Sequence, residues 1–321
     1  MIVVTGGAGF IGSAIVWRLN TLGKTDILIV DELGIADKWK NLVPLKFYDF
    51  MNKLVFIQKL NELDFNIEAI IHMGANSSTT EKDADHLLTN NYEYTRSLAE
   101  FCIKRNIRFI YASSAATYGD GSLGFDDSEK LSASLHPLNM YGYSKNLFDI
   151  KAEREGWFNR IVGLKYFNVY GPNEYHKEDM RSVVHKAFEQ IRDTGRVTLF
   201  KSMNPKFKDG EQKRDFIYVK DAVDMTLFFL ENSAAGLFNI GSGKARTWND
   251  LVKSIFNALN KPLNIEYINL PLEIADRYQY FTEAKMEKIK KTGYSAEATS
   301  LEEAVADYVK NYLMKALYLG Y

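Results

Sequence analysis

The chain has 321 residues, of which 46% are hydrophobic, a length and composition that predict two domains around a sizeable core. Lysine and arginine number 40 against 41 aspartate and glutamate, so the formal charge of −1 offers no overall field to attract nucleic acid or an anionic membrane. The single cysteine, Cys102, excludes an intrachain disulfide, and no Cys/His spacing typical of zinc occurs. Without a charged leader or a long apolar run, we expect a soluble, cytoplasmic protein with no metal and no nucleic-acid or membrane partner.

Short β-branched runs alternate with longer helical patterns along the first half of the chain. Strands are predicted at residues 2–5, 27–31, 69–72, 108–113 and 161–166. Helices are predicted at residues 11–22, 81–105 and 141–154. This alternation is typical of an α/β fold with a doubly wound parallel sheet, the Rossmann arrangement.

The alternation becomes irregular after Pro172. Helices are predicted at residues 183–192, 222–231, 248–259 and 301–313, and short strands at 197–200, 216–219, 237–240 and 265–268. We expect residues 1–170 to form a dinucleotide-binding domain to which segments around 214–245 return, the 237–240 strand among them. Residues 171–321 are then mainly a smaller, mixed α/β substrate-binding lobe.

A glycine motif, Gly7-x-Gly9-x-x-Gly12, lies between the first predicted strand and the first predicted helix. Its glycines allow a tight turn, a close approach of the backbone to a pyrophosphate, and close packing of helix against strand. The pyrophosphate would lie at the helix N-terminus, where free N–H groups favour anions. Asp31, 19 residues after Gly12 at the end of the next strand, completes the pattern of a dinucleotide site.

The residues around Asp31 leave the form of the dinucleotide open. An acidic side chain at this strand end accepts a hydrogen bond from the ribose 2′-hydroxyl of NAD, whereas the 2′-phosphate of NADP favours nearby cations. Asp31 and Glu32 therefore favour NAD, while Lys38 and Lys53 favour NADP.

A second motif places Tyr141 and Lys145 four residues apart at the start of a predicted helix. On a shared helix face, the lysine ammonium would lower the pKa of the phenol toward that of a general base. Ser114 follows a strand at its C-terminal end, where open α/β sheets bind their ligands, and its hydroxyl would contact a substrate oxygen. A Tyr/Lys pair alone is more often a solvated helix face, but the serine and the nucleotide motif favour an acid/base site.

Together these motifs resemble those of the extended short-chain dehydrogenases/reductases, the NAD-dependent epimerase/dehydratase family. The glycine motif, the Ser-Ala-Ala-Thr-Tyr-Gly block at residues 114–119 and the Tyr-x-x-x-Lys pair occur in the order typical of that family. The resemblance implies that Tyr141, Lys145 and Ser114 are the catalytic tyrosine, lysine and serine.

Within this family the chain closely resembles the 6-epimerases of ADP-heptose, which invert C6 of ADP-D-glycero-D-manno-heptose for the inner core of lipopolysaccharide. The stretches that carry this closer resemblance are residues 74–81, 137–145 and 277–279, while residues 166–172 and 214–221 resemble substrate-side motifs of nucleotide-sugar enzymes in the family generally. The resemblance implies a homo-oligomer, a homopentamer in the family, and bound NADP. NAD stays possible because of Asp31 and because Glu32 stands where the family commonly has an amide.

The resemblance also assigns site residues. Lys177 is implied as a catalytic residue, a second base beside Tyr141. Cofactor contacts are implied for Gly6, Gly9, Phe10, Ile11, Gly12, Asp31, Glu32, Lys38, Lys53, Met73, Gly74, Ala75, Asn76, Ser77, Asn90, Lys145, Val169 and Lys177. Substrate contacts are implied for Asn168, Asp179, Lys186, Phe200, Lys201, Ser202, Met203, Arg214 and Tyr278.

An epimerase at a carbon with no acidic C–H needs a ketone intermediate, for which a bound dinucleotide takes hydride from C6 and returns it to the other face. Tyr141 and Lys177 would exchange the hydroxyl proton, and which base serves which epimer stays open. A UDP-sugar 4-epimerase is the alternative enzyme, and a non-catalytic dinucleotide sensor is the alternative from another class. The absence of an Asp-Glu pair from the block at 113–116 disfavours a 4,6-dehydratase.

Overall fold

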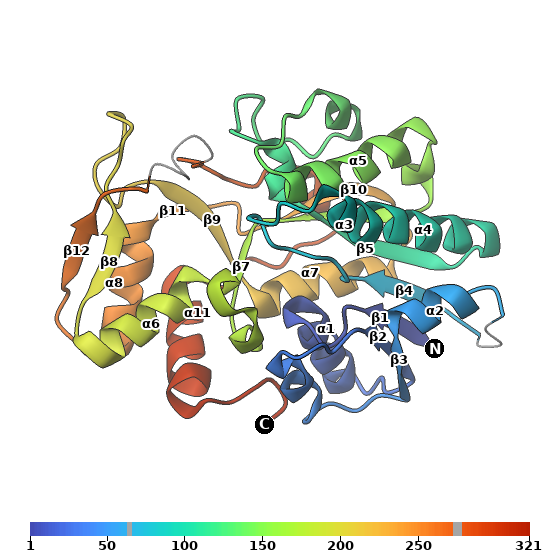
Figure 1. Cartoon of the computed structure of the whole chain (residues 1–321), viewed down its shortest axis with the longest axis horizontal. Helices are drawn as coiled ribbons and strands as arrows, with labels where there is room; N and C mark the ends of the chain where they lie inside the picture. Colours follow the sequence, from blue (N-terminus) through green and yellow to red (C-terminus); the bar gives the residue numbers. More distant parts are fainter. Residues whose placement is uncertain (63–65, 272–277) are drawn as a thin grey trace.

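A seven-stranded parallel sheet forms the centre of the computed structural model, which describes residues 1–62, 66–271 and 278–321 (Figure 1). In spatial order its strands are β10 (Gly236–Ile240), β6 (Val162–Tyr166), β5 (Arg108–Ser114), β4 (Ala69–His72), β1 (Ile2–Thr5), β2 (Ile27–Asp31) and β3 (Asp49–Asn52). Chain order reverses between β1 and β4, so a crevice opens at the carboxyl ends of these strands. Doubly wound sheets bind their ligands at this position.

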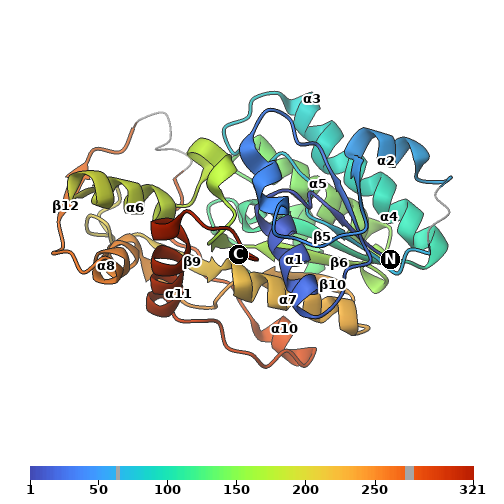
Figure 2. The ribbon, with the colours of Figure 1, turned by 90° about the horizontal axis from the view of Figure 1, so that it is seen from below.

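Helices cover both faces of the sheet, which is why β1, β2, β4, β6 and β10 are buried at every residue. One face carries α1 (Phe10–Thr21) and α7 (Val219–Glu231), which pack against each other. The other face carries α2 (Lys53–Lys59), α4 (Tyr94–Arg105) and α5 (Met140–Arg154), and Figure 2 shows the two helical layers on opposite sides.

The second lobe lies beyond the β7 region, at the left of Figure 1. Its elements include the parallel pair β8 (Val197–Phe200) and β12 (Ile265–Ile268), with helices α6 (Val183–Thr194), α8 (Trp248–Ala258) and α11 (Leu301–Asp307). A three-stranded sheet, β11 (Ala245–Thr247), β9 (Lys213–Tyr218) and β7 (Asn168–Tyr170), connects the lobe to the main sheet. One cluster of buried apolar side chains runs from α1 and α7 into α6, α8 and α11, so the two parts share a core.

The remaining elements are short. They are α3 (Ala84–Leu87), α10 (Glu287–Lys291), π-helical turns at Leu88–Glu93 and Tyr308–Tyr312, and 3-10 helices at Asp37–Leu42, Ala115–Tyr118, Glu129–Ser134, Trp157–Asn159, Tyr175–Met180 and Leu313–Lys315. No helix in the described part of the chain combines the length and apolar character needed to cross a membrane.

The predicted doubly wound parallel sheet is confirmed, and β10 returns to its edge beside β6 as expected. Three helices differ from the prediction, because 81–105 begins at Ala84, 222–231 begins at Val219 and 301–313 gives way to π-helical geometry at Tyr308. Strands β3, β7 and β11 were not predicted, since they are short and none is a fully buried apolar run. The division near residue 170 stays a prediction.

Candidate active site

Four adjoining cavities follow the carboxyl edge of the sheet into the second lobe. Cavity I (about 420 Å³) lies beyond β2 and shares Asp31 and Lys38 with cavity II (about 510 Å³), which faces the glycine turn. Cavity II shares Ser114 and Tyr141 with cavity III (about 390 Å³), and cavity III shares Tyr278 with cavity IV (about 350 Å³) in the lobe. Because neighbouring cavities share walls, ligands bound in cavities II and III would meet at Ser114 and Tyr141.

The glycine turn forms one wall of cavity II. Gly6 has a φ of +66°, a left-handed conformation that favours glycine, and a Cβ at Gly12 would lie 2.1 Å from the carbonyl oxygen of Gly6. Helix α1 starts after Gly9, and no side chain caps its N-terminus. Its first N–H groups are therefore available to an anion in cavity II.

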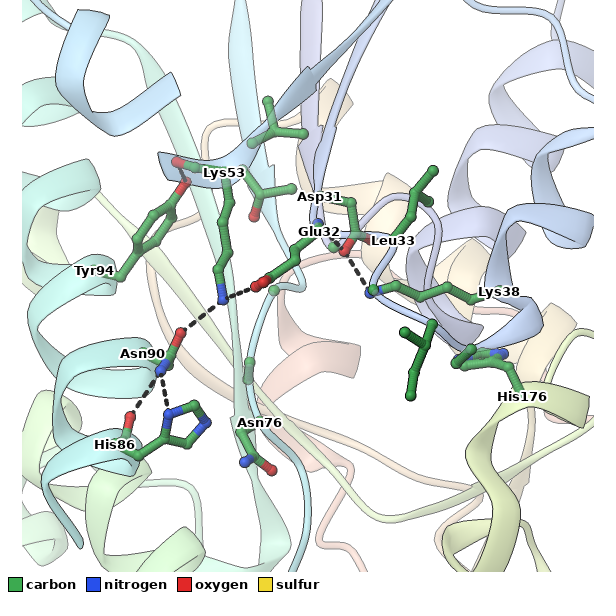
Figure 3. A pocket seen from close by; sticks show the side chains of 18 residues that line it. Asp31, Glu32, Leu33, Lys38, Lys53, Asn76, His86, Asn90, Tyr94 and His176 are labelled. Atoms are coloured by element: carbon green, nitrogen blue, oxygen red, sulfur yellow. Dashed lines mark hydrogen bonds and ion pairs between the residues drawn. The ribbon is translucent and has the colours of Figure 1, made fainter. Parts of the chain in front are cut away.

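The two carboxylates and two lysines that gave conflicting signals all line cavity I (Figure 3). The Lys38 ammonium donates to Asp31 Oδ1 over 2.7 Å. The Lys53 ammonium lies 2.5 Å from Glu32 Oε2 and donates to Asn90 Oδ1 over 2.9 Å. The hydrogen bond and charge of Lys53 lower the pKa of Glu32. The acidic residues that favour NAD and the lysines that favour NADP are thus paired with each other in the folded protein.

The remaining predicted cofactor residues line cavities I and II as well. Gly6, Gly9, Phe10, Ile11, Gly12, Met73, Gly74, Ala75, Asn76, Ser77, Lys145, Val169 and Lys177 line cavity II, and Asn90 lines cavity I. Residues that are far apart in the sequence are therefore brought together as predicted, although no ligand contact is tested.

Tyr141 lies in the first turn of α5, where Asn139 caps the helix by accepting a hydrogen bond from the Gly142 N–H over 2.8 Å. A Cβ at Gly142 would lie 2.7 Å from the carbonyl oxygen of Ala116, so the glycine lets α5 approach the segment after β5 closely. Tyr141 and Ser114 therefore line the same two cavities, II and III, and Ser114 is the side chain that lowers the pKa of the phenol.

Burial raises the pKa of Tyr141, and Ser114 is the side chain that lowers it. Lys145 is 3% exposed, and burial lowers its own pKa to about 8 against an opposing effect of Asp149. The expected influence of Lys145 on the Tyr141 phenol stays a prediction.

Asp149, one turn after Lys145 on α5, lies at the centre of a fully buried polar cluster. Its carboxylate accepts hydrogen bonds from Tyr111 (2.7 Å) and Ser113 (2.7 Å), and the Lys165 ammonium lies 3.1 Å away. The partners come from β5 and β6, so the cluster fixes α5 against the central strands. It supports the face of α5 that carries Lys145.

Lys177 lies in the loop that follows β7 and lines cavity II together with Tyr141. Its ammonium lies 5.3 Å from the centre of the Phe10 ring. Burial lowers the pKa of Lys177, and the charge of Glu174 opposes the shift. A lysine with a lowered pKa in the same cavity as Tyr141 fits the predicted second base.

A buried carboxylate anchors the Lys177 loop. Glu174 accepts hydrogen bonds from the Ser182 N–H (2.6 Å), the Ser182 hydroxyl (2.6 Å) and the Tyr308 hydroxyl (3.0 Å), and its backbone carbonyl accepts from the Lys177 N–H (3.0 Å). The residue is completely buried, and desolvation raises the pKa of its side chain. The carboxylate connects the loop to α6 and to the C-terminal helical segment.

The C-terminal segment contacts the same loop at two further points. The Tyr175 hydroxyl lies 3.3 Å from the Tyr312 carbonyl and 3.2 Å from the Leu317 carbonyl. The Leu319 N–H donates to Asn173 Oδ1 over 2.9 Å. Residues more than 130 positions later in the chain thus hold the loop that carries Lys177.

Arg214 dominates the polar lining of cavity III. Its guanidinium lies between the rings of Trp248 (5.6 Å) and Tyr278 (5.4 Å) and donates to the backbone carbonyl of Gln279. Burial lowers the pKa of Arg214 to about 10, so the group keeps its charge near neutral pH. A buried planar cation between aromatic rings is suited to a diphosphate.

The other predicted substrate residues divide into two groups. Asn168 lines cavity III, and Lys186 and Phe200 line cavity IV. Four described residues line none of the four cavities: Asp179, Lys201, Ser202 and Met203. The last three follow β8 in a segment that turns back on itself, with the Ser202 N–H donating to Asp209 and the Ser202 hydroxyl donating to the Asn204 carbonyl. Arg277, in one of the resemblance stretches, lies outside the described residues.

Sequence reasoning missed several side chains that line the cavities, His176 and Trp248 among them. His176 lines cavities I and II, and burial lowers its pKa to about 4, so the ring is neutral near pH 7. Its position beside Lys177 was the available signal. Trp248 lines cavities III and IV and donates to the Tyr278 hydroxyl over 3.2 Å. A tryptophan at the start of an amphipathic helix is typical of a core residue, so no local signal distinguished it.

Comparisons with known proteins agree with the fold. A model of the NAD dependent epimerase/dehydratase family matches residues 2–241. Proteins named ADP-L-glycero-D-manno-heptose-6-epimerase from Nitratidesulfovibrio vulgaris (strain DP4) and Fusobacterium nucleatum subsp. nucleatum are 52% and 51% identical to this chain. The matches cover 98% of this chain in both cases, and 99% and 98% of those proteins.

Solved structures show the same similarity. The Helicobacter pylori ADP-L-glycero-D-manno-heptose-6-epimerase is 27% identical, with a TM-score of 0.81 over 97% of this chain and 95% of that chain. The UDP-glucose 4-epimerase of Thermotoga maritima, solved with UDP-glucose, is 27% identical, with a TM-score of 0.79 over 98% and 99%. The UDP-glucuronic acid 4-epimerase of Bacillus cereus, solved with UDP-glucuronic acid and NAD, is 26% identical, with a TM-score of 0.77 over 97% and 99%. The chain therefore belongs to the NAD dependent epimerase/dehydratase family.

Proposed function

We propose that the protein converts ADP-D-glycero-D-manno-heptose to ADP-L-glycero-D-manno-heptose by inverting C6, a step toward the inner core of lipopolysaccharide. The observation that carries this proposal is the presence of two candidate bases, Tyr141 and Lys177, in one cavity that continues into a substrate-side cavity. The full-length relatives named for this reaction support the choice of sugar nucleotide.

A nicotinamide dinucleotide fits the residues of cavities I and II. Side chains are excluded at Gly6 and Gly12, which leaves a cradle of backbone at the uncapped N-terminus of α1. When bound, the nicotinamide ring supplies a reversible hydride acceptor. The resemblance predicts NADP, with Lys38 and Lys53 as the cations nearest to a 2′-phosphate, and Asp31 keeps NAD possible as the residue that would bind a 2′-hydroxyl.

The side chains of this chain then remove the proton of the C6 hydroxyl as the ketone forms and return a proton to the C6 oxygen as the ketone is reduced. Tyr141, with its phenolate form favoured by the Ser114 hydroxyl, accepts the proton of the C6 hydroxyl in one epimer. Lys177 performs the same task for the other, because inversion changes the direction in which the C6 oxygen points. Lys145 lies one turn from Tyr141 and would bind the nicotinamide ribose, and Arg214 would hold the substrate diphosphate.

The substitution Tyr141→Phe tests the proposal. We expect it to lower the rate of C6 inversion by about 10³-fold or more, since it removes one proton-transfer group, while dinucleotide binding is retained. The product is measured by separating the two ADP-heptose epimers chromatographically, and the bound dinucleotide by mass spectrometry. Tyr143→Phe is the matched control, because Tyr143 is 46% exposed on the same helix and lines none of the four cavities. Unchanged inversion by Tyr141→Phe would contradict the mechanism.

A UDP-sugar 4-epimerase is the second candidate, favoured by the similarity to solved 4-epimerases at 26–27% identity. The two activities are distinguished by comparing kcat/KM for ADP-D-glycero-D-manno-heptose and UDP-glucose. We expect a preference of at least about 100-fold for the ADP-heptose, roughly 2.7 kcal/mol of transition-state binding. The cytoplasmic location and the homopentamer stay predictions, the latter tested by light scattering.

A further inference from the structure

Cavity I contains four charged Asp, Glu and Lys side chains that neutralise one another in pairs (Figure 3). Asp31 pairs with Lys38 over 2.7 Å, and Glu32 pairs with Lys53 over 2.5 Å. The four formal charges sum to zero. Of the two histidines that also line this cavity, His176 is neutral near pH 7 because burial lowers its pKa to about 4.

The two carboxylates have different structural roles. Asp31 is 7% exposed, and it accepts hydrogen bonds from the Ala8 N–H (2.8 Å), the Glu32 N–H (2.7 Å) and Lys38. It therefore ties the end of β2 to the glycine turn and belongs to the framework of the site. The Glu32 side chain is 52% exposed and reaches across the cavity to Lys53. Removing the Glu32 charge thus changes the cavity without disturbing the turn.

Lys53 is held between two acceptors. Its ammonium contacts Glu32 on one side and donates to Asn90 Oδ1 over 2.9 Å on the other, and Asn90 is itself fixed by donating to the His86 carbonyl over 2.9 Å. An ammonium has three N–H groups, and two of them are engaged here. A phosphate that approached Lys53 would meet the Glu32 carboxylate at the same nitrogen.

We propose that Glu32 is the residue that determines the cofactor preference, by occupying Lys53 and so favouring the 2′-hydroxyl of NAD over the 2′-phosphate of NADP. The inference rests on the proposed binding of a nicotinamide dinucleotide. A phosphate monoester brings a charge of about −1.5 to −2 at neutral pH into a cavity whose side chains already balance. It must displace Glu32 from Lys53 or remain beside an uncompensated carboxylate, whereas a hydroxyl group imposes neither cost.

We expect a moderate preference for NAD over NADP, because the Glu32–Lys53 pair is partly exposed, with 52% and 29% of the two side chains accessible. Exposed pairs are weakened by solvent and salt. We therefore expect the wild-type protein to bind NAD about tenfold more tightly than NADP at physiological salt. The substitution Glu32→Gln keeps the shape of the side chain and frees the Lys53 charge, so we expect it to tighten NADP binding about tenfold and to change NAD binding by less than about threefold.

The test is a competition experiment on the full-length protein. Wild type and Glu32→Gln are dialysed to equilibrium against equal concentrations of NAD and NADP, and the bound dinucleotides are released by denaturation and quantified by mass spectrometry. The bound ratio gives the ratio of the two Kd values without any measurement of epimerase activity. Asp37→Asn is the matched control, because it changes the net charge equally and breaks an exposed pair with Lys40 of 2.6 Å while lining none of the four cavities.

A second substitution assigns the effect to Lys53. In the Glu32→Gln background, Lys53→Met should cancel the gain in NADP binding and return the bound ratio toward that of the wild type. Glu32→Ala should reproduce the effect of Glu32→Gln if the glutamine variant folds poorly.

The inference is overturned if Glu32→Gln leaves the bound ratio unchanged, if Asp37→Asn shifts it equally, or if Lys53→Met fails to cancel the shift. It is also overturned if the wild type binds NADP more tightly than NAD. These outcomes leave the proposed epimerase intact. Retention of neither dinucleotide would overturn the proposed function together with the inference.

Discussion

Ser114 illustrates how single residues control the chemistry at Tyr141. Both lie where cavities II and III meet, and the serine hydroxyl is the group that lowers the pKa of the phenol against the effect of burial. Its Oγ also accepts a hydrogen bond from the Ala116 N–H over 3.1 Å, which fixes the rotamer of the serine. The position of the hydroxyl is therefore set by the backbone before a substrate binds.

We expect Ser114→Ala to raise the pKa of Tyr141 further. Activity that depends on the phenolate rises as pH increases through this pKa, so the acidic limb of the kcat profile should move to higher pH. At pH 7 the loss should be about 10- to 100-fold. The measurement is the rate of C6 inversion between pH 6 and 10, and Ser114→Thr, which keeps the hydroxyl, should restore part of the wild-type profile. A uniform loss at every pH would indicate a merely structural role.

Much of the site was predictable at the residue scale because its motifs are local. Spacing within one turn or one helix was enough to predict Gly9, Gly12, Tyr141 and Lys145. The pairing of Glu32 with Lys53 was not predictable, because it depends on the parallel register of β2 with β3, which places Asp31 opposite Asn52. Which lysine meets which carboxylate follows from packing and not from distance in the sequence.

At the scale of elements, the loop after β7 is the part of the site that most depends on its surroundings. It contains the left-handed residues Asn173 (φ 78°) and Glu178 (φ 47°), on either side of Lys177. Its order is maintained by Glu174 and by the C-terminal segment rather than by hydrogen bonds of a regular helix. The buried carboxylate of Glu174 needs its donors, because an unpaired buried acceptor costs about 1–3 kcal/mol.

We expect Tyr308→Phe, which removes one donor to Glu174, to lower the free energy of unfolding by about 1–3 kcal/mol and kcat by about tenfold. Dinucleotide binding in cavity I should be unaffected, since Tyr308 lines none of the four cavities and its hydroxyl pairs with Glu174 and His185. Urea denaturation and steady-state kinetics measure the two effects, and Tyr321→Phe, at a 65% exposed position, is the control. A loss of stability without a loss of kcat would contradict the prediction that the contact between Tyr308 and Glu174 helps to position Lys177.

The elements themselves were predicted where burial makes the pattern clear. Strands β1, β2, β4 and β10 are continuous apolar runs, and their predicted bounds agree with the structure to within one residue. The residues assigned to the substrate at 201–203 follow β8 in an irregular segment, whose course depends on local turns such as the one closed by Asp209. The resemblance that assigned these positions contains no information about the course of such a segment, and the assignments stay predictions.

At the scale of the whole molecule, both halves of the sequence contribute to the main sheet and to one apolar core. The edge of the main sheet is β10, and α7 covers one face, although both follow residue 170 in the chain. The shared apolar core extends from α1 to α11. Because the parts before and after residue 170 share this core, we do not expect that boundary to separate independent folding units.

We expect a fragment of residues 1–170 to fail to fold alone, because it exposes the edge of β6 and the apolar face that α7 covers. It should bind a hydrophobic dye and retain no dinucleotide, whereas coexpression with residues 171–321 should restore both compactness and binding. Size-exclusion chromatography and bound-dinucleotide analysis test this. A folded 1–170 fragment that holds a dinucleotide would instead support an independent domain ending there.

The contacts between the Lys177 loop and the C-terminal segment also affect the order in which the site assembles during synthesis. Tyr175 and Asn173 form hydrogen bonds with residues that follow them in the chain by 137 to 146 positions. At a synthesis rate of about 5–20 residues per second, the ribosome reaches those partners roughly 7 to 30 s after making the loop. A nascent chain can thus assemble the glycine turn and the Tyr141 helix while the second base is still unanchored. Anchoring of the Lys177 loop is therefore expected to be among the last steps in the assembly of the site during synthesis.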